Sequence, residues 1–372
     1  MQSTADHVDQ AEYDAILVMG FGGPEKPEDV MPFLERVVQG RNVPRERLLS
    51  VAEHYQHLGG RSPINDQCRA LIAALKPELV AHGIELPIYW GNRNWHPFLT
   101  DTLQAMQRDG VKRALVYVTS AFSSYSGCRQ YLEDMEKARA SLGEGAPVLE
   151  KLRVFYNHPG FVDAVADRVG EALERVPDAH RPGARLVFTA HSIPIAMATG
   201  CDYVAQLQEI AGVVAQRLGR GAGKRPQPIV SGAVSAGAAS ATDFDLVYQS
   251  RSGPPQVPWL EPDILDHLRA LAARGDVRDV VVSPLGFVSD HMEVIWDLDH
   301  EAKALAAELK LGFYRAGTPG EHPRFIAMIR ELIQERLGSI TTRRTCGGSV
   351  ARPDQCAPGC CAYSPGRPAP RS

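Results

Sequence analysis

Short apolar runs alternate with amphipathic stretches along most of the sequence, and this alternation limits the fold more than any other feature. The apolar runs predict strands at 15–19, 87–90, 114–119, 152–156, 186–189, 244–248 and 277–282. The amphipathic stretches predict helices at 27–38, 66–81, 98–108, 129–141, 204–218, 262–273 and 323–337. Such alternation implies parallel sheets that helices cover on both faces. We therefore expect an α/β fold.

The length of 372 residues suits two domains of ordinary size. We expect a polar N-terminal arm at 1–13, one domain at 14–160, a second at 161–338 and a cysteine-rich tail at 339–372. The tail is rich in Thr, Arg, Cys, Gly and Pro and has little apolar content. It is therefore predicted to be disordered unless a metal holds it in place.

Composition excludes several classes of protein. A formal net charge of -4 and the absence of a basic block argue against a nucleic-acid partner. No apolar run approaches the length of a transmembrane segment, and the first twelve residues lack the features of a secretory signal. The sequence therefore predicts a cytoplasmic protein. With no obvious apolar dimer surface, a monomer is the default expectation.

Polar and glycine-rich motifs follow the ends of the predicted strands. They include G-F-G-G-P at 20–24, G-N-R-N-W-H-P at 91–97, S-A-F-S-S-Y-S at 120–126, H-S-I-P at 191–194 and Q-S-R-S-G at 249–253. In open parallel sheets, ligands bind outside the carboxyl ends of the strands. These motifs therefore predict one cleft between the two domains. The G-F-G-G-P turn lacks the spacing of a dinucleotide or phosphate loop.

Carboxylates recur at a regular interval in the stretch 283–301. Asp290 is predicted to cap a helix on which Glu293, Asp297 and Glu301 lie four residues apart, so that they share one face. One interpretation is a solvated helix face. The alternative is a partly buried row of oxygen ligands for a divalent cation, which the interleaved residues 294–296 favour because they are apolar.

His191 leaves a buried strand in the motif T-A-H-S-I-P. An imidazole at such a rim can accept protons or bind a metal, although a lone His is as often held by a backbone carbonyl. Glu293 offers an opposing oxygen ligand. One His and one carboxylate are too few for a structural zinc site, and they suit an ion that is held briefly.

Several of these motifs together resemble the ferrochelatase signatures. They are T-A-H-S-I-P, Y-Q-S-R-S-G-P, P-L-G-F-V-S-D-H-M-E-V-I-W-D-L-D, V-M-G-F-G-G-P-E, H-L-G-G-R-S-P-I-N and the Y-S-G-C loop, in the family's order and spanning about 14–338. The resemblance implies the chelatase fold, with two similar Rossmann-like domains that clasp a porphyrin. It implies insertion of Fe2+ with release of two pyrrole protons. His191 is then the proton acceptor and iron contact, Glu293 faces it, and Asp297 and Glu301 continue the metal row.

The sequence is most similar to the actinobacterial and firmicute branch, which metallates coproporphyrin III. Ser62, Tyr125 and Tyr55 match substrate contacts of that branch. Two positions depart from it: Phe21 replaces a Tyr that ligates the product iron in some members, and His54 replaces an Arg. The alternatives are a protoporphyrin IX ferrochelatase and a non-catalytic metal or tetrapyrrole carrier. An iron donor and other enzymes of heme synthesis are the further partners that the family implies.

The tail resembles that of family members that carry a [2Fe–2S] cluster. In those members one ligand comes from a mid-chain loop and three come from the C-terminus. Cys128 is the mid-chain candidate, and Cys346, Cys356, Cys360 and Cys361 are four candidates for three places. Structural zinc and a redox-labile free tail are the alternatives. Cys68 and Cys201 are expected to be buried in helices.

Overall fold

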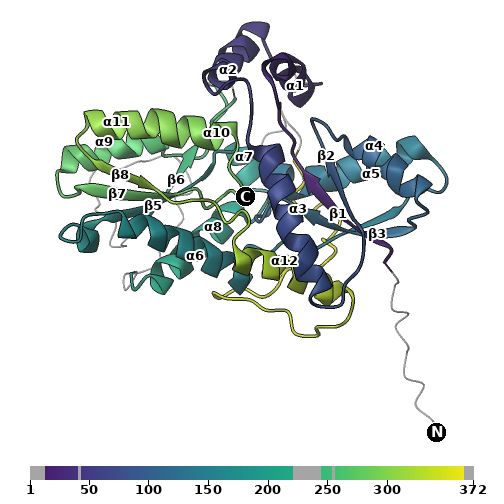
Figure 1. Cartoon of the computed structure of the whole chain (residues 1–372). Helices are drawn as coiled ribbons and strands as arrows, with labels where there is room; N and C mark the ends of the chain where they lie inside the picture. The colour runs from purple at the N-terminus through teal and green to yellow at the C-terminus, as the bar shows by residue number, and fades with distance from the viewer. Residues whose placement is uncertain (1–12, 41–42, 221–243, 254–255, 364–372) are drawn as a thin grey trace.

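The protein contains two four-stranded sheets, and every strand pair in them is parallel. This computed structural model describes residues 13–40, 43–220, 244–253 and 256–363. The first sheet has the order β2-β1-β3-β4 and the second has the order β6-β5-β7-β8. The strands are β1 (Ala15–Gly20), β2 (Ile88–Asn92), β3 (Arg113–Val118), β4 (Val148–Lys151), β5 (Arg185–His191), β6 (Phe244–Gln249), β7 (Asp279–Ser283) and β8 (Gly312–Arg315). The two sheets thus repeat one topology, and they occupy opposite sides of the molecule (Figure 1).

The central strands are apolar on both faces because helices cover both sides of each sheet. All six residues of β1 and all five residues of β7 are buried. The predicted α/β fold with two sheets is confirmed. The domain boundaries at 160 and 338 stay predictions, and the arm at 1–13 lies outside the described residues except for Tyr13.

Helices surround the two sheets, and two of them, α1 and α2, stand apart from the others on one side (Figure 1). The first half contains the 3-10 turn η1 (Pro27–Asp29), α1 (Val30–Val37), α2 (Arg45–His57), α3 (Ile64–Val80), α4 (Leu99–Arg108), the π-turn η2 (Tyr125–Arg129) and α5 (Gln130–Leu142). The second half contains α6 (Pro159–Glu174), η3 (Arg181–Gly183), α7 (Ile195–Ala198), α8 (Tyr203–Arg217), α9 (Ile264–Arg274), α10 (Met292–Val294), the π-helix η4 (Ile295–Ala302), α11 (Lys303–Glu308) and α12 (Pro323–Arg336). Figure 1 shows α1 and α2 standing above the two sheets.

One hydrophobic core joins the two halves. Helix α12 packs against α3 of the first half and against α6 of the second. Phe155 links them further, because its ring lies 5.9 Å from Phe161 of α6 and 6.0 Å from Phe325 of α12. The halves are therefore packed as one body and are not merely tethered by the chain.

Three local predictions are wrong. Residues 152–156 form no strand; β4 lies earlier, and these apolar residues are buried in the shared core of α6 and α12 instead of pairing in the sheet. Asp290 is not a helix cap, because its carboxylate binds Arg315 and His291 occupies the cap position of α10. The sequence analysis also missed α2, α6 and β8, whose hydrophobic patterns are short or interrupted.

The described part of the tail, 339–363, packs on the folded body, and the prediction that order depends on a bound metal stays a prediction. Arg344 forms an ion pair with Glu331 of α12, and Arg352 forms one with Asp202.

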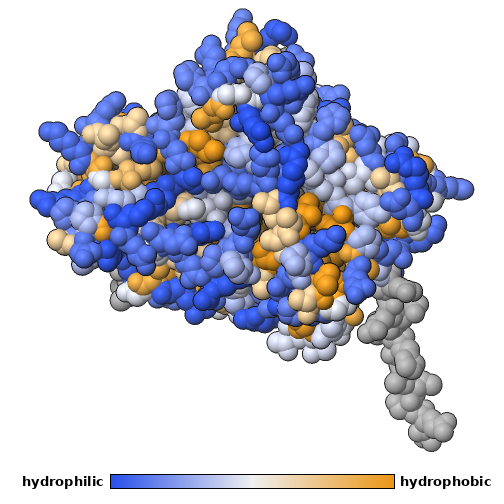
Figure 2. Space-filling view, viewed as in Figure 1, coloured by the Kyte–Doolittle hydropathy of each residue, from blue (hydrophilic) through white to orange (hydrophobic). Residues whose placement is uncertain are grey.

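No helix among the described residues is long and apolar enough to cross a membrane. The face of the molecule seen in Figure 2 is mostly hydrophilic, with small separate apolar patches.

Candidate functional site

His191 is the last residue of β5, and its orientation fixes the proton on one ring nitrogen. Its Nδ1 lies 2.5 Å from the backbone oxygen of Ser192. Because a carbonyl oxygen only accepts hydrogen bonds, Nδ1 carries the proton and the lone pair of the neutral ring is on Nε2. Tyr203 donates to the backbone oxygen of His191 at 3.1 Å and braces the strand end. The half-buried imidazole thus presents a proton acceptor.

Glu293 faces this acceptor, as the sequence analysis predicted. Its Oε2 lies 3.7 Å from Nε2 of His191 and 3.9 Å from Nδ1 of His291. Burial is the largest influence on His291 and lowers its pKa, although the charge of Glu293 acts in the opposite direction. His291, whose ring packs against Phe287, is therefore held neutral beside the carboxylate. Sequence reasoning did not assign His291, although it lies in the same motif.

Asp297 lies on η4 and is partly buried. Ser250 donates to its Oδ2 through the hydroxyl, and Gln249 donates to the same oxygen at 3.3 Å. Burial and the negative charges of Glu293 and Glu301 raise the pKa of Asp297 to about 7, against the effect of these hydrogen bonds. The charges of Glu293 and Glu301 therefore both act on Asp297, and the role of the row in metal binding stays a prediction.

Ser250 and Gln249 were quoted in a motif but given no role. Gln249 is the last residue of β6 and Ser250 follows it, so their position at a strand end was the available signal. Ser250 has a φ of 63°, a left-handed conformation that is uncommon for a residue with a Cβ. This conformation accompanies the hydroxyl's contact with Asp297.

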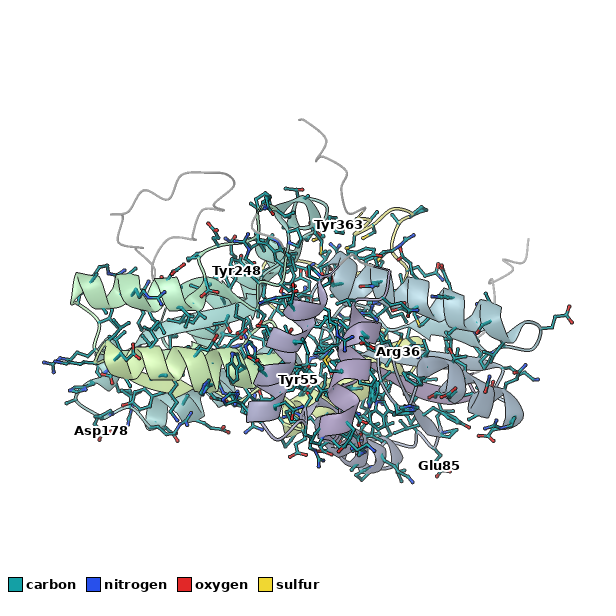
Figure 3. All side chains as sticks on the ribbon, turned by 90° about the horizontal axis from the view of Figure 1, so that it is seen from above. Arg36, Tyr55, Glu85, Asp178, Tyr248 and Tyr363 are labelled. Carbon is teal, nitrogen blue, oxygen red and sulfur yellow. The ribbon has the colours of Figure 1, made fainter. Side chains whose placement is uncertain are left out.

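The first half of the chain also contributes to this site. Ser62 accepts a hydrogen bond at 3.4 Å from the backbone nitrogen of Met292, the residue before Glu293. Tyr55 of α2 is 6% exposed, and its pKa is raised by burial and by the charge of Glu293. Figure 3, seen from above, places Tyr55 on α2 near the middle of the molecule. Two of the three predicted substrate contacts therefore lie beside Glu293.

An aromatic cluster lies between α1, α2 and the strand-end loops. The ring of Phe33 lies 6.3 Å from Phe21, 6.0 Å from Tyr55 and 6.2 Å from Trp95. His54 stacks on Trp296 of η4, with ring centroids 4.1 Å apart and planes 8° from parallel. The residues that depart from the resembling branch, Phe21 and His54, are thus both packed against aromatic rings.

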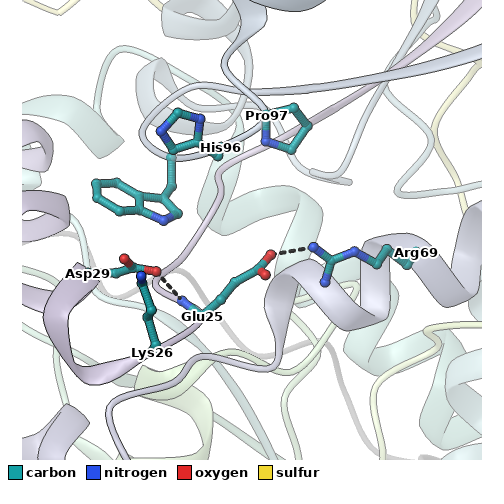
Figure 4. A pocket seen from close by; sticks show the side chains of 7 residues that line it. Glu25, Lys26, Asp29, Arg69, His96 and Pro97 are labelled. Carbon is teal, nitrogen blue, oxygen red and sulfur yellow. Dashed lines mark hydrogen bonds and ion pairs between the residues drawn. The ribbon is translucent and has the colours of Figure 1, made fainter.

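A separate pocket of about 600 Å³ lies beside the turn that follows β1. It is lined by Glu25, Lys26, Asp29, Arg69, Trp95, His96 and Pro97. Figure 4 shows Glu25 extended toward Arg69, with which it forms an ion pair. None of the predicted site residues lines this pocket, so we do not assign the site to it.

Cys128 and three tail cysteines meet in a chain of thiol contacts. Cys128 hydrogen-bonds with Cys356 and Cys356 with Cys360, and the sulfur atoms of Cys360 and Cys361 lie 3.7 Å apart. The hydrogen bond from Cys128 and the positive charges of Lys151 and Arg352 lower the pKa of Cys356. Cys346 is elsewhere: its Sγ donates to the backbone oxygen of Asn157 at 3.3 Å.

The remaining sequence predictions near the thiols have mixed outcomes. Cys68 is buried as expected, whereas Cys201 is only partly buried and donates to the backbone oxygen of Met197 at 3.3 Å. Tyr125 begins η2, beside Cys128; its hydroxyl donates to Glu133 at 3.0 Å and its ring packs near Tyr363. The structure thus places Tyr125 beside the described part of the tail, where its ring packs near Tyr363.

The tail is held by groups other than cysteine. Glu209 of α8 accepts hydrogen bonds from the backbone nitrogens of Gly348 and Ser349 at 2.7 and 2.8 Å, and from the Ser349 hydroxyl at 2.6 Å. The buried Asn157 donates to the backbone oxygens of Ser349 and Val350 at 3.0 and 3.2 Å. One carboxylate and one amide thus fix the segment between Cys346 and Cys356.

Neither set of residues forms a closed metal site. Across the described parts of the chain, no three or more His, Cys, Asp or Glu side chains are arranged so that they could hold a metal ion. At His191 and Glu293 the briefly held ion stays a prediction. At the cysteines the sulfurs meet pairwise.

A parallel α/β fold that opposes an imidazole with a row of carboxylates belongs to the class of metal-handling enzymes. The comparisons specify the family: the Ferrochelatase family model matches residues 13–337. The coproporphyrin III ferrochelatase of Nocardia farcinica is 53% identical over 353 residues, or 94% of this chain and 96% of that one. A ferrochelatase of Rhodopirellula baltica is 50% identical over 356 residues, or 96% and 95% of the two chains. The chain belongs to the ferrochelatase family and is a metal-insertion enzyme, with a porphyrin and Fe2+ as its substrates.

Proposed function

We propose that this enzyme inserts Fe2+ into coproporphyrin III and yields coproheme. The observation that carries the proposal is the opposed pair of His191 Nε2 and Glu293 Oε2, 3.7 Å apart. Further support comes from relatives: the coproporphyrin III ferrochelatase of Mycolicibacterium smegmatis is 50% identical over 357 residues, or 94% of this chain and 99% of that one. Residues of both halves surround the pair, as a flat substrate clasped between them requires.

Metal insertion releases the two pyrrole N–H protons of the porphyrin. The neutral His191 has its lone pair on Nε2, so it is suited to accept such a proton. Glu293 stabilises the imidazolium that forms and contributes an oxygen ligand to Fe2+ on the opposite side. Once Nε2 is protonated it has no lone pair to offer iron, so Glu293 alone holds the ion weakly and the macrocycle with its four nitrogens can take it over.

Asp297 and Glu301 extend the site away from His191. With its pKa near neutrality, Asp297 exchanges a proton easily, so it can alternate between a neutral group and an anionic oxygen ligand. We propose that these acids pass iron inward to Glu293 or protons outward. Ser62 and Tyr55 are the proposed contacts for the porphyrin rim, with Tyr125 the third. His54 stacks on Trp296 and replaces an Arg, so no bidentate clamp on a propionate is formed at this position.

The test is anaerobic Fe2+ insertion followed by absorbance, with coproporphyrin III and protoporphyrin IX in parallel. Wild type should turn over coproporphyrin III faster, and His191→Ala should lose turnover while still binding porphyrin. A preference for protoporphyrin IX would overturn the substrate assignment and keep the mechanism. A protein that binds porphyrin but inserts iron into neither would favour the carrier alternative.

We further propose that Cys128, Cys356, Cys360 and Cys361 hold a [2Fe–2S] cluster, with Cys346 outside the ligand set. Support comes from the donor chemistry, because four thiolates complete such a cluster and these four thiols lie in a chain of pairwise contacts. The charges of Lys151 and Arg352 suit the net negative charge of an iron–sulfur centre with four thiolates. Bound there, the cluster supplies one-electron redox chemistry and a covalent link between η2 and the tail.

Cysteine substitutions test this ligand set. Cys128→Ser should abolish the visible absorbance and the acid-labile sulfide of anaerobically purified protein, whereas Cys346→Ser should retain both. Zinc in place of iron would favour the structural-zinc alternative, and a colourless wild type without metal would favour the free tail. Equal loss in both variants would show that the ligand set is wrong.

We also propose that the enzyme works in the cytoplasm as a monomer and receives iron from a donor protein. Support comes from the cysteines, all seven of which are free thiols, as expected in a reducing compartment. Cell fractionation and light scattering test the location and the oligomeric state.

A further inference from the structure

One arginine connects two parts of residues 290–301, which we call the acidic segment and which contain Glu293. Arg315, the last residue of β8, pairs through Nη1 and Nη2 with the two carboxylate oxygens of Asp290, each at 3.0 Å. Its Nε donates to Asp299 at 2.7 Å. The arginine and Asp290 side chains are each 17% exposed, so this network is shielded from solvent. Figure 1 shows β8 beside the α10–α11 layer that contains the segment.

The two aspartates lie on either side of Glu293. Asp290 precedes it by three residues, and Asp299 follows on η4. A guanidinium that binds one carboxylate with two parallel hydrogen bonds and a second carboxylate with its third nitrogen restricts both position and orientation. Arg315 therefore fixes the start of α10 relative to the body of η4.

The same segment is held from the other half of the molecule. The side-chain oxygen of Gln67 on α3 accepts a hydrogen bond at 2.8 Å from the backbone nitrogen of Asp290. Ser62 does the same for Met292 at 3.4 Å. Arg315 holds the carboxylate of Asp290 while Gln67 holds its backbone. Glu293 is thus presented to His191 from a segment clamped on both sides.

Arg315 also determines which carboxylates are available to a cation. The stretch 290–301 contains five of them: Asp290, Glu293, Asp297, Asp299 and Glu301. Two are paired with the guanidinium, and the other three are the row proposed to handle iron. An oxygen atom that accepts from a guanidinium has less charge to offer a metal ion, so Arg315 keeps the cation on the side of His191.

We propose that Arg315 is a positioning residue for iron insertion, which aligns Glu293 with His191 and withholds Asp290 and Asp299 from Fe2+. It touches no substrate atom itself. Arg315→Met should reduce kcat about 10- to 100-fold, as expected when a reacting group moves by about 1 Å, and should raise the KM for Fe2+. The affinity for porphyrin, measured by fluorescence quenching, should change less than about 2-fold, because its proposed contacts near Glu293 are held by the first half of the chain: Tyr55 on α2 and Ser62 just before α3.

A second arginine provides the matched control. Arg185 pairs with both oxygens of Asp245 at 2.7 Å, and its side chain is 14% exposed, but it begins β5, at the opposite end from His191. Arg185→Met should lower the melting temperature to a similar extent and leave the KM for Fe2+ unchanged. A purely structural role for Arg315 would make the two variants alike, and that result would overturn the proposal.

Variants of the partners separate the two contributions. Arg315→Lys retains the positive charge but cannot form two parallel hydrogen bonds with Asp290, so it should recover only part of the activity. Asp290→Asn should reduce kcat more than Asp299→Asn, because Asp290 is closer to Glu293 in the sequence. All variants are compared at a temperature where circular dichroism shows them folded. A folded Arg315→Met with wild-type kcat and KM for Fe2+ would also overturn the proposal.

Discussion

The acidic segment and the cysteine tail both gather reactive side chains from distant parts of the chain, but by different means. His191 follows β5 and Ser250 follows β6, so the order of strands in one sheet brings them to the same edge. The described part of the tail beyond α12 contains no helix or strand, and its course depends on Glu209 and Asn157. The first arrangement follows from topology, whereas the second depends on a few polar contacts.

Because of this difference, the loss of a single side chain should affect the two regions in different ways. Removing one side chain from the acidic segment should change chemistry and leave the sheet intact. Removing one anchor of the tail should displace a whole segment, because no regular hydrogen-bond ladder supports it.

The largest effect is expected at the opposed pair. Glu293→Gln removes the charge that faces His191 and should lower kcat by about 10²- to 10⁴-fold, the range for loss of a group that assists proton transfer. Anaerobic insertion assays measure it, and Glu308→Gln on the exposed face of α11 is the control. Retention of activity would mean that Glu293 is not part of the metal site.

The second largest effect is expected in the tail, where it tests whether polar contacts alone hold the segment in place. Glu209→Ala removes three hydrogen bonds to Gly348 and Ser349. Hydrogen bonds to a charged group contribute about 1.5–3 kcal/mol, so amide exchange in 344–352 should accelerate about 10- to 100-fold. Hydrogen exchange is measured before and after iron removal, with the exposed Glu171→Ala as control. If amide exchange in the tail accelerated only after iron removal and not in Glu209→Ala, the metal and not Glu209 would hold the tail in place.

A pH experiment probes Asp297. Its folded-state pKa of about 7 exceeds the ordinary value, so the folded chain binds this proton more tightly than the unfolded chain does. The resulting stability is present below about pH 4 and is lost as pH rises through about 7. Wild type should therefore lose on the order of 2 kcal/mol of unfolding free energy relative to Asp297→Asn over that interval, since each pKa unit corresponds to about 1.4 kcal/mol and solvent screens part of it. Parallel urea titrations without iron measure this, and equal pH slopes would show that Asp297 is not perturbed.

The smallest effect concerns α2. His54→Ala removes the stack on Trp296 and should lower stability by about 0.5–1.5 kcal/mol, the range for aromatic pairs. Thermal unfolding measures it. His54→Phe retains a ring and should restore most of the loss; failure to do so would indicate that the polar imidazole matters more than the stack.

Much of the acidic segment's site was predictable from sequence, because parallel strands expose their carboxyl ends at one edge. His191, Glu293 and Asp297 could be placed on that basis. The sequence could not show that Asp290 is not a helix cap, because its partner Arg315 lies on β8, a short strand without a clear hydrophobic pattern. Hydrogen bonds between residues far apart in sequence have no local signature.

The tail was less predictable for the same reason. The crowd of cysteines indicated a site, but spacing alone left Cys346 and Cys361 equivalent. The structure distinguishes them through Asn157, which binds both the backbone and the thiol of Cys346. The strand expected at 152–156 likewise failed because its apolar residues pack on α12, which lies far away in the sequence.

A buried pair near that segment bears on how the four thiols come together. Arg153 binds Glu335 of α12 at 2.7 and 2.9 Å and donates to the backbone oxygen of Arg344 at 3.1 Å. Cys128 lies on η2, whereas its three thiol partners come after α12 and after the contact with Arg153 along the chain. The four thiols therefore come together through contacts made by α12 and the segment that follows it. A variant without that segment would keep both sheets and lose the thiol cluster.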